Sequence, residues 1–130
     1  MIVLDENIPE DQCQLLRKWR IRFRHIGQDL GRQGMKDHEH ILQLLHKLNR
    51  PTFITRDLGF FDESRCHANY ALVCLAVSQK DAARFLRRFL RHPGFNSKAK
   101  RLGVVVLASH QGLRVWRLGK SETEAADWID

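Results

Sequence analysis

The sequence predicts an α/β fold with a mainly parallel central sheet. Short apolar runs that suit buried strands alternate with amphipathic helical segments, and this alternation is typical of βα units. The first run, Ile2 to Leu4, passes directly into the carboxylates Asp5 and Glu6, and a later run repeats this design and ends at Asp57. Ligands bind beyond the carboxyl ends of strands in open α/β sheets, so we expect the functional site at these two strand ends.

The first half of the chain is expected to hold two helices between three strands, the first strand over residues 1–7 and the third over 51–57. Pro9 suits a helix entry, and this helix is expected to run to about Arg20. Residues 21–26 alternate in polarity and predict a short strand, whereas the glycine-rich residues 27–35 predict an exposed loop. Residues 37–49 place four apolar side chains on one face and therefore predict an amphipathic helix.

The second half of the chain predicts three further strands, over residues 70–77, 104–108 and 112–118. The last two are expected to pair as an antiparallel β-hairpin. A loop is expected over residues 58–69, a helix over 79–91 and a basic connector over 95–101. The acidic tail, from about residue 120 to 130, is expected to form a loose helix. We predict one domain over residues 1–130, which is long enough for a real core.

Composition excludes several classes of protein. Hydrophobic residues make up 43% of the chain, and no apolar run is long enough to span a membrane. The start of the chain has no basic and apolar pattern of a secretory signal, so a cytoplasmic location is expected. Three cysteines without C-x-x-C spacing argue against a disulfide framework or a zinc site. The net charge of +7 favours a polyanionic partner such as nucleic acid.

Acidic residues are expected to gather at one edge of the sheet: Asp5, Glu6, Asp37 and Asp57, with Asp62 able to join from the following loop. Mg²⁺ and Mn²⁺ prefer oxygen ligands, and a bound cation relieves carboxylate repulsion and activates water for attack on a phosphodiester. We therefore expect a metal site at Asp5 and Asp57. For Asp37, a helix N-cap is an equally good interpretation. Glu6 would point away from Asp5 if the strand continues.

Three segments resemble a small branch of the PIN-like superfamily. They are Leu4-Asp5-Glu6-Asn7-Ile8-Pro9, Gly34-Met35-Lys36-Asp37 and Thr55-Arg56-Asp57, in this order and roughly this spacing. The resemblance covers roughly residues 1–80, and the remainder fits only as a family-specific extension.

The resemblance implies a PIN-like fold, which is a three-layer α/β/α sandwich with a mainly parallel central sheet. It also implies an endoribonuclease that hydrolyses RNA phosphodiester bonds with Mg²⁺ or Mn²⁺. Asp5 would match the first-strand acid, Asp37 the helix-entry acid and Asp57 the acid after the strand. Many relatives are toxins of toxin–antitoxin pairs, which implies a small antitoxin-like protein partner. Relatives often read Thr-Arg-Asp-x-Asp-Phe, but here Gly59 replaces the second acid, and Asp62 is the residue that could compensate.

Basic residues in the second half of the chain are candidates for contacts with RNA or DNA: Arg84, Arg87, Arg88, Arg91, Lys98, Lys100 and Arg101. The alternative is a solvated helix face. Arg56 is expected to steady a substrate phosphate or to pair with an acid. Asn7 could hydrogen-bond the site or form a turn, and the turn is the expectation. The histidines are treated as structural or surface residues.

Two functions compete with the nuclease hypothesis. One is a PIN-like fold that has lost catalysis and binds nucleic acid, motivated by Gly59. The other is a protein-interaction module that forms one half of a complex with a small inhibitor. The motif-free second half of the chain, including the final hairpin, is either a homodimer surface or simply part of the core.

Overall fold

A single seven-stranded sheet forms the centre of the protein, in a computed structural model that describes residues 1–35 and 37–129. Its strands in chain order are β1 (Ile2–Leu4), β2 (Arg24–His25), β3 (Thr52–Thr55), β4 (Ala71–Leu75), β5 (Val104–Ser109), β6 (Gly112–Arg117) and β7 (Glu124–Ala126). In space they follow the order β2-β1-β3-β4-β5-β6-β7. Every pairing from β2 to β5 is parallel, so the expected mainly parallel sheet is confirmed.

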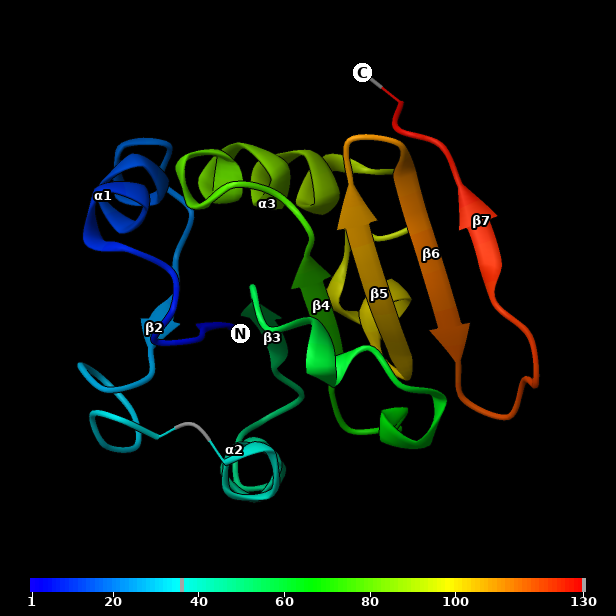
Figure 1. Cartoon of the computed structure of the whole chain (residues 1–130), viewed down its shortest axis with the longest axis horizontal. Coiled ribbons are helices and arrows are strands. Elements are labelled where there is room, and N and C mark those ends of the chain that lie inside the picture. Colours follow the sequence, from blue (N-terminus) through cyan, green and yellow to red (C-terminus); the bar gives the residue numbers. More distant parts are fainter. Residues whose placement is uncertain (36, 130) are drawn as a thin grey trace.

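Helices cover both faces of this sheet (Figure 1). The α-helices are α1 (Glu10–Lys18), α2 (His38–His46), α3 (Ala82–Arg91) and α4 (Lys98–Arg101), and the 3-10 helices are η1 (Leu58–Phe60), η2 (Glu63–Arg65) and η3 (Gln79–Asp81). Helices α1 and α3 pack on one face and α2 on the other. No helix in the described part of the chain is long and apolar enough to cross a membrane.

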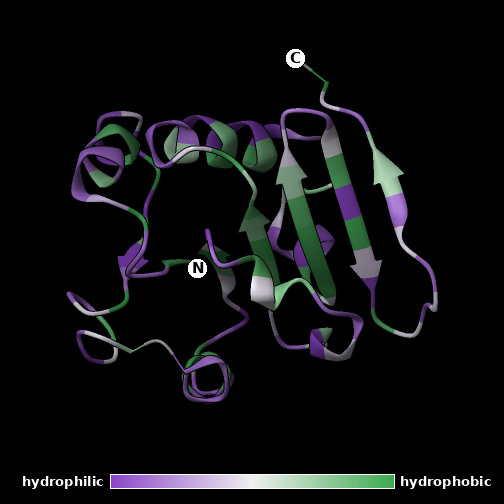
Figure 2. Cartoon of the chain, viewed as in Figure 1, coloured by the Kyte–Doolittle hydropathy of each residue, from purple (hydrophilic) through white to green (hydrophobic). Residues whose placement is uncertain are grey.

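Two rows of apolar side chains run across the sheet, one on each face. The row under α1 and α3 is Leu4, Ile54, Val73, Val106 and Val115, and the row on the α2 face is Val3, Phe53, Leu72, Val105 and Trp116. Both follow from strand geometry, because successive side chains point to opposite faces. Strands buried on both faces read as continuous apolar runs, which is why β4 and β5 are strongly hydrophobic in Figure 2.

The C-terminal part of the chain is partly as expected. Strands β5 and β6 pair antiparallel, which confirms the predicted hairpin. The prediction of a loose helix in the tail is wrong, because Glu124–Ala126 forms β7 and pairs antiparallel with β6. Glutamate and alanine have low strand propensity, so this strand depends on the edge that β6 offers.

Trp128 holds the tail against the sheet beyond β7. Its indole N–H donates a hydrogen bond to the carbonyl oxygen of Ser109 at 2.7 Å. The indole ring packs against the core on the α3 face, edge-on to Phe85 with ring centroids 5.7 Å apart. An aromatic ring with one polar atom can bury its body while its N–H stays paired, and this suits Trp for the role.

We predict that Trp128→Ala lowers the free energy of unfolding by roughly 2 kcal/mol, since it removes a large, half-buried apolar group. Trp128→Phe should cost about 1 kcal/mol, because mainly the hydrogen bond is lost. Urea unfolding measures both. Ile129→Ala is the control, because this neighbouring side chain is 65% exposed. Equal effects of Trp128→Ala and Ile129→Ala would show that the tail is not docked.

Candidate functional site

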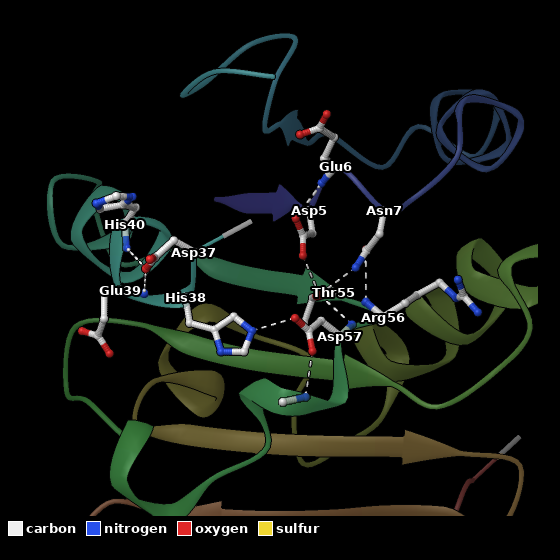
Figure 3. Close-up of polar contacts among 11 residues, drawn as sticks. Asp5, Glu6, Asn7, Asp37, His38, Glu39, His40, Thr55, Arg56 and Asp57 are labelled. Carbon is white, nitrogen blue, oxygen red and sulfur yellow. Dashed lines mark hydrogen bonds and ion pairs between the residues drawn. The ribbon is translucent and has the colours of Figure 1, made fainter. Parts of the chain in front are cut away.

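The hydroxyl group of Thr55 joins the carboxyl ends of β1 and β3 (Figure 3). It donates a hydrogen bond to Asp5 Oδ2 at 2.6 Å. It accepts hydrogen bonds from Asn7 Nδ2 at 3.2 Å and from the backbone N–H of Asp57 at 2.9 Å. A hydroxyl has one proton and two lone pairs, so all its hydrogen-bonding capacity is used. Thr55 is completely buried, so water does not compete for these bonds.

Parallel pairing explains why these residues meet. Leu4 lies opposite Ile54 in the β1–β3 ladder, so the next residues, Asp5 and Thr55, are also neighbours. The backbone N–H of Asp5 extends the ladder by donating to the Ile54 carbonyl at 2.8 Å. The expectation that Asp5 and Asp57 lie together at one sheet edge therefore agrees with the structure.

Asp5 is a buried carboxylate, with only 6% of its surface exposed. Besides the Thr55 bond, its Oδ1 accepts from the backbone N–H of Glu6 at 2.7 Å. Burial raises the pKa of Asp5; these two hydrogen bonds oppose the rise, and the nearby charges of Asp57 and Glu6 add to it. The folded protein therefore holds this proton more tightly than the unfolded chain, and the contribution of Asp5 to stability falls as the pH rises through the folded pKa.

Asp57 has the opposite electrostatic environment. Burial favours a higher pKa, but the His38 hydrogen bond and the backbone N–H of Gly59 outweigh it and hold the pKa of Asp57 below its usual value. Its Oδ2 lies 2.6 Å from His38 Nε2, and its Oδ1 accepts from Gly59 N–H at 2.8 Å. The contribution of Asp57 to stability is therefore lost as the pH falls through its folded pKa.

Besides Thr55, His38 is a site residue that sequence reasoning missed. Its ring lies against Phe60 with centroids 4.0 Å apart, and this contact aims Nε2 at Asp57. A signal was present, because His38 is three and seven residues before Ile41 and Leu45, the two residues that α2 buries. Positions with this spacing share one helix face.

Gly59 makes the space that His38 occupies. A Cβ atom at residue 59 would lie 2.8 Å from His38 Cε1, closer than real Cβ contacts allow, and 3.0 Å from Asp57 Oδ1, which is tighter than most of them. The glycine is therefore matched to the histidine of α2. The imidazole and Asp57 fill the region that a side chain at residue 59 would enter.

A pocket of about 350 Å³ opens between these strand ends, lined by Asp5, Glu6, Asn7, Met35, Ile41 and Asp57. The Glu6 carboxylate accepts from the backbone N–H of Gly34 at 3.0 and 2.7 Å, so it ties the glycine-rich loop to the pocket. Asn7 does more than form the expected turn, because its amide bonds Thr55 and accepts from the Arg56 N–H at 3.2 Å.

Two of the predicted acids are placed differently from the metal-site expectation. Asp37 is an exposed N-cap whose carboxylate accepts from the backbone N–H groups of Glu39 and His40, and these bonds lower its pKa. Asp62 likewise caps η2 and accepts from Ser64. Neither is among the described lining residues of the pocket. Over residues 1–35 and 37–129, no three His, Cys, Asp or Glu side chains are gathered as a metal-binding group.

The predicted phosphate-binding residues are largely used in packing. Arg56 donates from Nε and Nη2 to the Val77 carbonyl at 3.2 and 3.1 Å and pairs with no acid among the described residues. In α3, Arg87 lies 3.7 Å over the Trp19 ring and Arg88 lies 4.4 Å over the Trp128 ring. These guanidinium groups cover aromatic side chains, in the geometry of cation–π contacts.

The remaining basic candidates lie on α3 or at the far end of the sheet. Arg84 pairs with Asp81 at 3.1 Å, while Arg91 is exposed. Arg101 is not a surface contact, because it is buried and donates to Thr52 Oγ1 at 3.0 Å. Thr52 begins β3, so Arg101 and its helix α4 lie at the amino-terminal edge, opposite the pocket. Lys98 and Lys100 belong to the same helix.

Comparison with known proteins adds no relative. No family model, no curated protein and no solved structure matches the chain significantly.

We predict that Thr55→Val lowers the free energy of unfolding by about 2 kcal/mol, because buried partners of the hydroxyl are left unpaired. It should also raise the pKa of Asp5 further, since a hydrogen bond that lowers it is lost. Urea unfolding and ¹³C carboxyl NMR measure the two effects. Thr55→Ser, which keeps the hydroxyl, should shift the Asp5 titration little. A Thr55→Val protein as stable as Thr55→Ser would contradict the central role of the hydroxyl.

We predict that Gly59→Ala displaces His38 and lowers stability by about 1–2 kcal/mol, the usual cost of overpacking. In a His38→Ala background the same change should cost less, because the ring it meets is gone. The difference, a coupling of about 1 kcal/mol, follows from a double-mutant cycle. Purely additive effects would show that residue 59 and His38 do not compete for space.

Proposed function

We propose that this chain is a PIN-like, metal-dependent endoribonuclease that hydrolyses RNA phosphodiester bonds in the pocket at the ends of β1 and β3. The observation that carries the proposal is that Asp5 and Asp57, from adjacent parallel strands, line one pocket and are joined through a single buried hydroxyl. The net charge of +7 supports a polyanionic substrate.

The donor set fits a hard divalent cation in one of its usual binding modes. Mg²⁺ is commonly held by one or two carboxylates, with waters and substrate phosphates completing its coordination. Asp5 and Asp57 would be those two carboxylates, so the site needs neither Asp37 nor Asp62. When bound, the cation would supply an activated water and neutralise charge on the phosphodiester.

The residues around the two acids would keep them in position. Thr55 fixes the orientation of Asp5 and the backbone of Asp57. His38 fixes the second oxygen of Asp57, and the low pKa of Asp57 keeps it ionised for a cation. Glu6 would hold the glycine-rich loop beside the substrate through Gly34. A catalytic group that is held by its neighbours needs little reorganisation during the reaction.

A second candidate is a nucleic-acid-binding domain with the same fold and no catalysis. Two observations favour it: Gly59 stands where the resembling family has an acid, and the described pocket lining contains neither Asp37 nor Asp62. This candidate predicts that RNA binding persists in Asp5→Asn, with no cleavage in the wild type.

We predict that Mn²⁺ raises the unfolding temperature of the wild type and supports cleavage of RNA, and that Asp5→Asn and Asp57→Asn lose both effects. A ligand that binds only the folded state stabilises it by roughly 2.7 kcal/mol at 100 times its Kd. Thermal unfolding with Mn²⁺, Mg²⁺ or EDTA and a gel assay on labelled RNA provide the measurements.

Asp62→Asn is the matched control, because asparagine also caps helices and the residue lies outside the described pocket lining. It should keep the metal response and the activity. Asp37→Asn distinguishes the two-carboxylate site from the three-acid site of the resemblance: retention of metal binding supports the former. A wild type that neither responds to a divalent metal nor cleaves RNA, yet binds it, would favour the second candidate.

A further inference from the structure

A second and larger cavity, of about 680 Å³, lies beside the segment that connects α1 to β2. We call it the arginine cleft, and it is lined by Arg17, Arg20, Ile21, Arg22, Phe23 and Asp29. Guanidinium groups provide its charge, while Ile21 and Phe23 are half-buried and pack against the core. None of these residues belongs to the acid pocket or to the basic set expected from the sequence.

Two of the three arginines in the cleft have free charges. The guanidinium groups of Arg20 and Arg22 are exposed and form no hydrogen bond or ion pair with any other described residue. Arg17 pairs with Glu10 at 2.8 Å and lies 5.2 Å over the Phe23 ring. The Asp29 carboxylate also lines the cleft, where it accepts the His25 N–H, so the two unpaired guanidinium groups outnumber the one carboxylate of the lining and leave positive charge next to an apolar and aromatic floor.

The backbone at Arg20 places this side chain at the end of α1. Arg20 has a φ of 61°, in the left-handed region, and follows the C-cap Trp19 of α1. Glycine is the usual residue there, because it adopts this conformation without steric cost. Arg20 ends α1 in this way, as the Ile21 N–H to Leu16 carbonyl hydrogen bond of 2.9 Å shows, and Arg50 adopts the same region with a φ of 50°; the side chain of Arg20 adds a cation to the cleft.

Closure of the neighbouring sheet edge argues against a protein strand as the partner. His25 is the residue of β2 whose backbone faces outward, and its N–H donates to Asp29 Oδ2 at 2.9 Å while its carbonyl accepts from Asp29 N–H at 2.8 Å. Ile26 also bridges to Leu30. A peptide that adds to a sheet needs free backbone groups along the edge strand, and β2 has none to offer.

We infer that the arginine cleft binds the sugar–phosphate backbone of a single-stranded nucleic acid. Charged grooves with aromatic side chains suit single strands, because cations follow the phosphates and the apolar floor contacts sugars or bases. The choice of RNA as the polymer rests on the proposed function. Binding at the cleft requires neither a metal nor the acid pocket, so the two can be tested separately.

The test measures fluorescence anisotropy of a labelled single-stranded RNA of about 12 nucleotides, in EDTA and at several salt concentrations. The variant is Arg20→Gly with Arg22→Ala, in which glycine preserves the backbone conformation. We expect Kd to rise by about tenfold or more and the salt slope to fall by about 1.4, since each phosphate contact on a single strand contributes about 0.7.

The matched control is Arg114→Ala with Lys120→Ala, which removes two exposed positive charges on and just after β6, at the far side of the sheet from β2, and should change Kd by less than about twofold, as expected for screened charges remote from the contact. An equal loss in both double variants would overturn the inference in favour of diffuse charge attraction. So would unchanged binding in the cleft variant. Polyglutamate that competes as well as RNA would identify an acidic protein partner instead, and tighter binding of a duplex would exclude a single-strand site.

These outcomes are separate from those of the proposed function. If the cleft variant loses RNA binding and the wild type cleaves no RNA, the cleft inference is supported and the nuclease proposal is rejected. If the wild type cleaves RNA and the cleft variant binds RNA normally, the nuclease proposal is supported and the cleft inference is rejected.

Discussion

One buried hydroxyl group determines how the carboxyl ends of the two central strands are arranged. Thr55 satisfies Asp5, Asn7 and the backbone of Asp57 at once, so two carboxylates stay close in a largely buried region. Without this bridge their mutual repulsion and the cost of burying Asp5 would both favour separation. The pKa values of the two acids shift in opposite directions for another reason: burial raises the pKa of Asp5, whereas the hydrogen bonds from His38 and Gly59 lower the pKa of Asp57.

Much of this arrangement could be predicted from the sequence, because it depends on local patterns. Apolar runs give the parallel strands, and parallel strands bring residues that follow them to one edge, so Asp5 and Asp57 were expected to meet. Thr55 and His38 could not be found in this way. Their roles depend on which atom faces which across the β1–β3 ladder and the α2 contact, and sequence spacing carries that information only weakly. Asp37 shows this limit. The sequence pattern places it on the apolar face of the helix, but the face that α2 buries contains Ile41 and Leu45 with His38, so Asp37 is exposed.

The second half of the chain shows where local patterns fail. The tail reads as acidic and weakly structured, yet it becomes β7 because β6 leaves an edge and Trp128 reaches the core. The basic residues of α3 and α4 read as one surface, but the fold divides them between aromatic contacts and the buried bond of Arg101 to Thr52. The net charge of a sequence predicts the sign of a partner's charge, whereas the fold determines which charged side chains are free to contact that partner.

The closed edge of β2 has a consequence for assembly. A sheet with open outer strands can join a neighbouring copy strand to strand, which leads to dimers or to aggregates. Here Asp29 occupies the outward backbone groups of His25 on one side of the sheet. The opposite side ends in β7, which has three residues and carries Glu124. A short, charged strand is a poor template for growth, so the sheet is protected at both margins and any self-association would have to use helix surfaces or loops instead.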